Sequence, residues 1–265
     1  MARTIAPTMS RVLERLELER PEIVTSAELA RILVEEGIST PAAVFASRLR
    51  DKGWLLPTGQ RGVWEFVPAA VAGPYSSMDP LLPVKAFAAA HPDCGAALTM
   101  HAAAWALGLA DRAPTVMDVA LPASPGKTAI PEGMATHVFS PALSTVEARG
   151  TDSLAPESAL VHMAARPNEV RSWQSAQEWL PNMAYEASVD RVLEELASRP
   201  PSVWARTGYL LQGMRPDISK AVAAERKPVS KVRFGPRTKS LRNDERWNIS
   251  DTALPFDPRN MEDVR

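Results

Sequence analysis

The side chains with the clearest potential for chemistry in this chain are cations that could bind phosphate. Between residues 39 and 62, four of them stand against one carboxylate, a local charge of +3: Arg48, Arg50, Lys52 and Arg61. Arginine can contact both phosphate oxygens and a guanine edge, whereas lysine contacts phosphate as a point charge. The pattern therefore favours contact with DNA. A solvated helix face and a protein-docking surface are the competing interpretations, because nine basic and nine acidic residues cancel over residues 1–68.

A second group of cations lies near the C-terminus. Residues 226–246 hold eight basic residues against two acidic ones, a local charge of +6, with Phe234 and Trp247 inside or beside the run. Cations interleaved with aromatic rings suit phosphate contact combined with base stacking, on DNA or on RNA. A solvated charged face is the competing interpretation. The candidate residues of this basic run are Lys231, Arg233, Arg237, Lys239 and Arg242.

No group of residues has the spacing of a catalytic or metal centre. The stretch SPGKT at residues 124–128 resembles part of a phosphate loop, but Leu121 stands where that loop requires glycine and Pro131 interrupts the helix that should follow. The stretch therefore predicts a turn. The four histidines share no ligand spacing with one another or with Cys94, the single cysteine. We predict no catalytic residue, no metal and no cofactor.

The first group of cations is positioned by two predicted helices. Thr25 begins a capping box before an apolar-periodic run, and Gly37 supplies a left-handed stop. Thr40 is the predicted N-cap of the next helix, with Pro41 at its first position and Gly53 after its end. The short, glycine-containing connection between the two helices predicts a helix-turn-helix.

A β-hairpin is predicted directly after these helices. Two β-prone runs, residues 54–56 and 63–66, flank a glycine-bounded tip that carries Arg61. A helix-turn-helix followed by such a hairpin is a winged helix.

The second helix of this motif has two different faces. Phe45 and Leu49 form its inward stripe, and the other side, which includes Ala46, is small, polar or basic. A duplex groove can approach such a face closely. The candidate DNA-contacting residues are Thr25, Ser26, Ser39, Thr40, Ala43, Ser47, Arg48, Arg50, Lys52, Gln60 and Arg61.

Length and composition predict a two-domain globular protein. The chain has 265 residues, a net charge of −1 and 45% hydrophobic residues. One cysteine fits a reducing compartment, and no apolar run reaches the length of a membrane span, so we expect a cytoplasmic protein with no membrane partner. The predicted domains are a winged helix-turn-helix over residues 1–68, a linker or strap over 69–83, and a C-terminal domain over 84–265.

The C-terminal domain is predicted to be mixed α/β and largely helical, which makes the fold class α+β. Helices are expected over residues 84–90, 98–109, 156–165, 170–179, 189–198 and 202–211, and strands over 115–121 and 136–139.

Three short motifs, together with the N-terminal winged helix, resemble the AbiEi family of antitoxins from type IV abortive-infection toxin–antitoxin pairs. They are AAWALGL at residues 103–109, LAPESAL at 154–160 and RTGYLL at 206–211. The resemblance implies a cytoplasmic prokaryotic protein whose winged helix binds repeats in its own promoter and represses its operon. It also implies that the C-terminal part opposes a nucleotidyltransferase-type toxin without a stable complex. The basic run could serve either role.

The first hypothesis is therefore a DNA-binding autorepressor and antitoxin. The alternative is an RNA- or protein-binding module that uses the winged helix and the basic run. An enzyme acting on the toxin or its product is a third hypothesis, which the absence of a convergent acid–base set disfavours. The operator, the toxin and how it is opposed, the oligomeric state and the role of residues 226–246 are left open.

Overall fold

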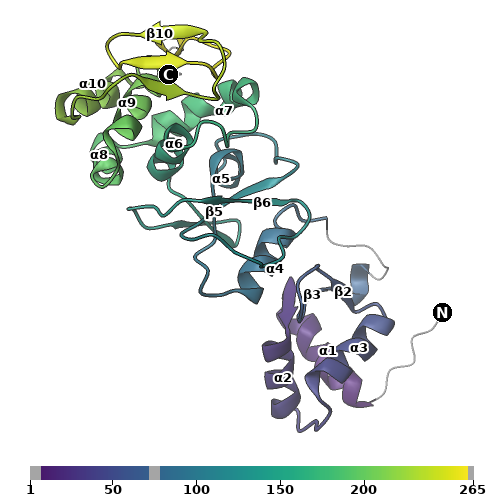
Figure 1. Cartoon of the computed structure of the whole chain (residues 1–265). Coiled ribbons are helices and arrows are strands. Elements are labelled where there is room, and N and C mark those ends of the chain that lie inside the picture. The colour runs from purple at the N-terminus through teal and green to yellow at the C-terminus, as the bar shows by residue number, and fades with distance from the viewer. Residues whose placement is uncertain (1–6, 72–77, 262–265) are drawn as a thin grey trace. The chain divides into compact units, whose positions relative to one another are not determined.

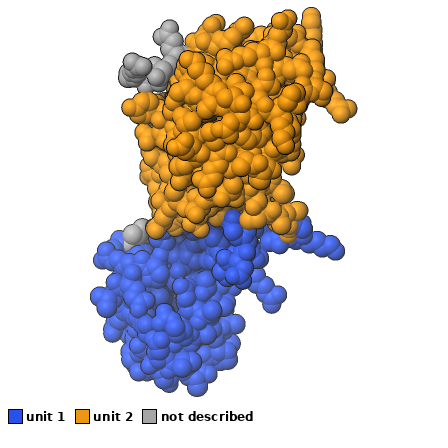
Figure 2. Space-filling model, turned by 90° about the vertical axis from the view of Figure 1, so that its left-hand side faces the viewer, with its two compact units in different colours: residues 1–95, 126–134 blue, residues 96–125, 135–265 orange. Residues whose placement is uncertain are grey.

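The computed structural model describes residues 7–71 and 78–261. The chain forms two compact units, one made of residues 1–95 with 126–134 and the other of residues 96–125 with 135–265 (Figure 2). Both units combine helices with short strands (Figure 1). The predicted α+β fold class is confirmed.

The first unit has the element order of a helix-turn-helix followed by a hairpin. Its elements are α1 (Pro7–Glu19), β1 (Ile23–Thr25), α2 (Ser26–Glu35), α3 (Ala42–Asp51), β2 (Leu55–Pro57), β3 (Val63–Phe66), the 3-10 helix η1 (Ala69–Val71) and α4 (Leu82–Ala90). Strand β3 lies between β1 and β2 in an antiparallel sheet, with Val24 opposite Trp64 and Leu55 opposite Phe66. Sequence reasoning missed β1, which is only three residues long.

Local capping explains where the two central helices begin and end. The Thr25 hydroxyl accepts a hydrogen bond from the backbone N–H of Glu28, whose carboxylate accepts one from the Thr25 N–H, so the predicted capping box is present. Gly37 and Gly53 both adopt positive φ angles, of 67° and 71°. The prediction that Thr40 caps α3 was wrong. Pro41 is the N-cap, because its carbonyl already accepts the N–H of Phe45.

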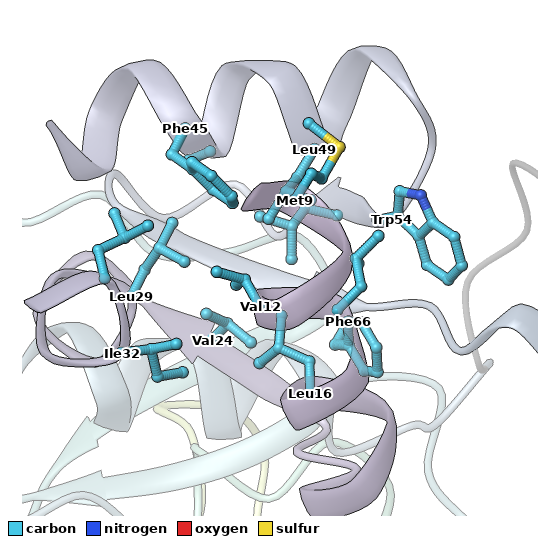
Figure 3. Close-up of a cluster of buried hydrophobic side chains, with 14 residues drawn as sticks. Met9, Val12, Leu16, Val24, Leu29, Ile32, Phe45, Leu49, Trp54 and Phe66 are labelled. Carbon is cyan, nitrogen blue, oxygen red and sulfur yellow. The ribbon is translucent and has the colours of Figure 1, made fainter. Parts of the chain in front are cut away.

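A hydrophobic cluster holds the helices and the hairpin of the first unit together (Figure 3). Every helix and strand from α1 to β3 contributes to it: Met9, Val12, Leu13, Leu16, Val24, Leu29, Ile32, Leu33, Phe45, Ala46, Leu49, Trp54, Leu55 and Phe66. Phe45 and Leu49 point inward as predicted. Ala46 was expected on the outer face, and this was wrong. It lies in the same helical turn as Phe45 and Leu49 and packs into the core, where it is 1% exposed.

Helix α4 belongs to the first unit rather than to the second. It packs against β1 and β3, with Val84 and Phe87 buried. Lys85 forms ion pairs with Asp79, at 2.9 Å, and with Glu22. Compactness therefore groups α4 with the N-terminal elements, whereas the sequence placed residue 84 at the start of the second domain. The predicted limits of the functional modules stay a prediction.

The second unit is built on a five-stranded sheet of order β6-β5-β4-β8-β7. Its strands are β4 (Ala97–Leu98), β5 (Met117–Leu121), β6 (Met134–Val138), β7 (Val146–Ala148) and β8 (Thr151–Ser153). Strands β4 and β8 pair in parallel, whereas β4 with β5 and β7 with β8 pair antiparallel. The predicted helix over 98–109 begins at residue 100, because residues 97–98 are needed as the central strand of this sheet.

Helices and a small second sheet complete the second unit. The helices are α5 (Met100–Ala106), α6 (Pro156–Ala165), α7 (Trp173–Glu186), α8 (Val189–Leu196), α9 (Pro201–Leu210) and α10 (Pro216–Glu225). Strands β9 (Val232–Phe234), β10 (Arg242–Asp244) and β11 (Ile249–Asp251) form a sheet of order β10-β11-β9, and the 3-10 helix η2 (Pro258–Asn260) follows. Helix α5 packs against β5, α6 against α5, α9 against α6, and β9 and β11 against α9. Among the described residues, no helix is both long enough and apolar enough to cross a membrane.

Candidate nucleic-acid interface

A groove lies between α3 and the β2–β3 hairpin in the first unit. Its volume is about 800 Å³, and no carboxylate stands among its lining residues. The lining consists of Ser26, Ala43, Ser47, Arg50, Pro57, Gly59, Gln60, Arg61, Gly62, Val63 and Trp64. The groove therefore brings together six of the predicted DNA-contacting residues: Ser26, Ala43, Ser47, Arg50, Gln60 and Arg61.

Helix α3 presents its side of the groove because its opposite face is fixed in the core. Ala43, Ser47 and Arg50 are spaced by four and three residues, so they share one face, and all three are exposed. Phe45 and Leu49, which are 2% and 0% exposed, fix the rotation of the helix about its axis. The outer face thus offers one guanidinium beside two small side chains.

The hairpin of β2 and β3, which we call the wing, forms one side of the groove and is fixed to the start of α2. The backbone N–H of Ser26 donates to the carbonyl of Gly62 at 2.8 Å, and the Ser26 hydroxyl donates to the same oxygen at 3.2 Å. Gly62 has φ +75°, and a Cβ there would lie 2.6 Å from Ser26 Oγ, so the contact requires glycine. Within the hairpin, the Thr58 hydroxyl donates to the carbonyl of Val63 at 2.9 Å. Ser26, predicted to contact DNA, therefore holds the wing in place.

The remaining predicted residues lie outside the groove lining. The hydroxyl of Thr25 is used in the capping box, and Ser39 and Thr40 belong to the turn before α3. Arg48 is exposed and Lys52 is half-buried near the end of α3. Sequence reasoning, in turn, missed Trp64. The signal for it was available, because Trp64 alternates along β3 with the buried Val63 and Glu65.

The two groove arginines are electrostatically uncompensated. Within the part of the chain that the structure describes, neither Arg50 nor Arg61 forms an ion pair, and both are exposed. Several other cations of the first unit are paired; Arg15, for example, contacts both Glu19 and Glu35. A groove with unpaired cations and no carboxylate attracts a polyanion.

The basic run near the C-terminus divides into free and structural cations. Lys231, Arg233, Arg237 and Lys239 are exposed, and none of them forms an ion pair within residues 7–71 and 78–261. Arg242, by contrast, donates to Asp251 Oδ2 at 3.3 Å and to the carbonyl of Leu254. Its guanidinium therefore joins β10 to β11 and to the segment after it.

Base stacking by the aromatic residues of this run, one of the two interpretations, is wrong. Phe234 and Trp247 are both 0% exposed, so neither ring face can meet a base. Phe234 packs against Tyr209 of α9, and the Trp247 ring lies below the guanidinium groups of Arg226 and Arg246, at 4.9 and 5.3 Å. These aromatic residues attach the small sheet to the helices.

The second unit contains a polar cluster that sequence reasoning also missed. His137 Nε2 lies 2.9 Å from Asp118 Oδ1, and its Nδ1 lies 3.1 Å from Glu169 Oε2. His162, fully buried, has its Nδ1 2.8 Å from Thr99 Oγ1, and burial lowers the pKa of this histidine. Among the described residues, no group of His, Cys, Asp and Glu could hold a metal ion. The partners of this cluster come from β5, β6, α6, the loop after α6 and the N-cap of α5, which no local spacing reveals.

Two comparisons with known proteins found a match, one over part of the chain and one over nearly all of it. Residues 96–213 match the family model of the AbiEi antitoxin C-terminal domain. The crystal structure of the RV2827C protein from Mycobacterium tuberculosis is similar over 96% of this chain and 94% of that chain, with 26% sequence identity and a TM-score of 0.75. No curated protein sequence matches the chain. The resemblance inferred from the three motifs is confirmed, and the groove lies outside the residues that the family model matches.

Proposed function

From the match of residues 96–213 to the AbiEi antitoxin C-terminal domain family, we propose that the chain is an antitoxin that also binds its own promoter DNA and represses its operon. The family supports an antitoxin role within a toxin–antitoxin pair. The promoter-binding part of the proposal rests on the first unit.

The observation that carries the DNA-binding proposal is the groove between α3 and the hairpin. It places the exposed Arg50 and Arg61 on opposite walls, with no carboxylate in its lining. In a winged helix-turn-helix the second helix enters the major groove, which is about 12 Å wide and admits an α-helix. Ala43 and Ser47 are small enough to let the backbone of α3 approach the bases.

The residues of the groove take different roles in this proposal. Arg50 reaches a base edge or an adjacent phosphate from α3, and Arg61 contacts the backbone from the wing. Ser26 sets the distance between these walls through its two bonds to Gly62. Arg48, which lies outside the groove lining, is assigned to flanking phosphate.

A binding comparison tests this part of the proposal. Full-length protein is titrated against the duplex upstream of its own reading frame and against a shuffled duplex of equal length and composition, at one fixed salt concentration. The proposal predicts at least about a thousand-fold preference for the promoter duplex, the lower end of specific recognition. Equal affinity for the two duplexes would refute promoter recognition.

We further propose that the second unit opposes a nucleotidyltransferase-type toxin encoded in the same operon, without forming a stable complex with it. The family match over β4 to α9 supports this assignment. Co-expression with the product of the neighbouring reading frame is expected to restore growth, while the two proteins elute separately on size exclusion. Growth arrest that persists on co-expression would refute the assignment.

A second candidate function is supported by the free cations of the basic run. Arg233 stands between the buried Val232 and Phe234 of β9, so it points away from the core, and the exposed Lys231 directly precedes the strand. Across the sheet, Arg233 lies beside Ser250, which lies opposite Asn243, so this row of the sheet has no carboxylate. Such a surface fits the phosphate backbone of RNA or DNA by charge alone.

A further inference from the structure

The segment of residues 126–134 belongs to the first unit although it connects two strands of the second. It follows β5 and leads into β6, and it contains the lysine of the SPGKT stretch that the sequence predicts to be a turn. Gly126 has φ +60°, as a turn requires. Because it belongs to the first unit, this turn has neighbours among the N-terminal elements.

Two contacts hold the segment against the winged helix. The side-chain amide of Gln60, at the wing tip, donates to the carbonyl of Ala129 at 3.2 Å. At the other end, a Cβ on Gly133 would lie 3.6 Å from Pro83 Cγ, so its backbone packs on the first turn of α4. Pro131 and Met134 are buried. The segment is therefore attached at the wing tip and at α4.

Lys127 is the cation that this arrangement brings to the wing. It stands two residues before Ala129, a separation of at most about 7 Å between their Cα atoms. It is exposed, and it forms no ion pair within the described parts of the chain. Gln60, which holds Ala129, precedes Arg61 directly in the sequence. Lys127 is thus tethered through Ala129 and Gln60 to the wing tip that carries Arg61.

We propose that residues 126–129 form a second arm beside the wing and that Lys127 contacts a phosphate of the bound duplex. This inference rests on the proposed promoter binding. In this arrangement Gln60 is a positioning residue, because its amide holds the arm instead of reading a base. A phosphate contact carries no sequence information, so Lys127 contributes affinity and salt dependence rather than specificity.

The first test is the salt dependence of binding by full-length protein. Lys127→Ala is expected to flatten the slope of log affinity against log salt by about 0.9, the value for one B-DNA phosphate contact. The ratio of affinities for promoter and shuffled duplex should stay unchanged. Lys220→Ala, an exposed lysine on α10 of the second unit, is the matched control and should leave the slope unaltered. An unchanged slope in Lys127→Ala would overturn the inference.

The second test asks whether Gln60 acts through the arm. Gln60→Ala releases Ala129, so it should cause the same flattening as Lys127→Ala, and the double variant should lose no more than either single one. Additive losses would show that Gln60 contacts DNA by itself and would overturn its positioning role. Wild-type protein with no preference for its promoter would overturn the proposed function, and with it this inference. Wild-type preference with a slope that Lys127→Ala leaves unchanged would overturn the inference alone.

Discussion

At the scale of single residues, the most specific prediction concerns the contribution of Arg50 to promoter binding. Replacing Arg50 by Ala should weaken binding to the promoter duplex by about 1–3 kcal/mol, the range for one base-edge contact, and should weaken binding to shuffled DNA less. Arg31→Ala is the matched control, because Arg31 is an exposed arginine on α2 paired with Glu35. Competition binding measures both losses. Equal loss on both duplexes would reduce Arg50 to a phosphate contact.

Two glycines of the wing allow the cost of a left-handed backbone to be measured separately from the cost of a steric clash. Gly59 and Gly62 have φ angles of +82° and +75°, but a Cβ at Gly62 would lie within 3 Å of Ser26 Oγ, whereas a Cβ at Gly59 would meet no atom within 4 Å. Gly59→Ala should therefore cost about 1–2 kcal/mol of stability, the penalty for a left-handed residue, and Gly62→Ala should cost more. Chemical denaturation of the two variants measures the difference. A smaller loss for Gly62→Ala would contradict the role assigned to Ser26.

Buried His162 makes the stability of the second unit depend on pH. Burial lowers its pKa below the ordinary value of 6.5, and burial lowers the pKa of His101 as well. The unfolded chain therefore binds more protons, so stability is fully present above about pH 6.5 and falls as the pH drops below it. The lowered pKa of Glu169 acts only below its ordinary value of 4.5.

Denaturation of the wild type and of His162→Asn across about pH 5 to pH 8 checks this expectation. The variant cannot titrate at residue 162, so its stability should change less steeply over this window. A wild-type stability that stays constant down to pH 5 would contradict the account of this histidine.

At the scale of elements, the salt dependence of binding tests whether the basic run contacts nucleic acid in addition to the groove. Replacing Lys231, Arg233, Arg237 and Lys239 by Ala should flatten the salt slope by about 0.9 for each contact made to B-DNA, or about 0.7 on a single strand. Flattening on RNA alone would favour the RNA-binding alternative. Arg242→Ala is the contrasting variant, and it should lower stability because its guanidinium holds β10 and β11. Slopes unaltered on both nucleic acids would leave the four cations as a solvated face.

Elements with strong local signals could be predicted from the sequence. The capping box at Thr25, the left-handed Gly37 and the inward Phe45 are properties of a few neighbouring residues, and the structure has all three. Helix α6 was also predicted with its observed limits. Strands β7 and β8 are each three residues long, and they were missed because three positions are too few to show an alternating pattern.

The parts of the candidate site that could not be predicted depend on contacts between distant segments. Ser26 and Gly62 are 36 residues apart, and Gln60 and Ala129 are 69 apart. No spacing in the sequence indicates that these pairs meet. The sequence also could not exclude stacking by Phe234 and Trp247, because the burial of both rings depends on contacts between α9 and the small sheet.

At the scale of the whole molecule, the extent of the first unit predicts which fragment folds. A fragment of residues 1–95 should be more stable than one of residues 1–68, because α4 covers β1 and β3 and buries Val84 and Phe87. Burying one such side chain contributes about 1.5–3 kcal/mol. Denaturant titration of the two fragments compares their free energies of unfolding. Equal stabilities would show that the unit ends before α4.

The two proposed activities should also separate between the two units. The groove belongs to the first unit, whereas the AbiEi match starts at residue 96. A variant that disables the groove is therefore expected to lose promoter repression and to keep antitoxin activity. This separation is the central claim, and both activities can be followed in the same cells.

The most direct measurement places a reporter behind the promoter of the operon in cells that also carry an inducible copy of the neighbouring toxin gene. Wild-type protein should repress the reporter and restore growth. The Arg50→Ala, Arg61→Ala double variant should release the reporter while still restoring growth, and the Arg11→Ala, Arg31→Ala control, which changes two exposed arginines of α1 and α2, should behave as wild type. Full repression by the double variant, at equal protein levels, would contradict the assignment of the groove to promoter DNA.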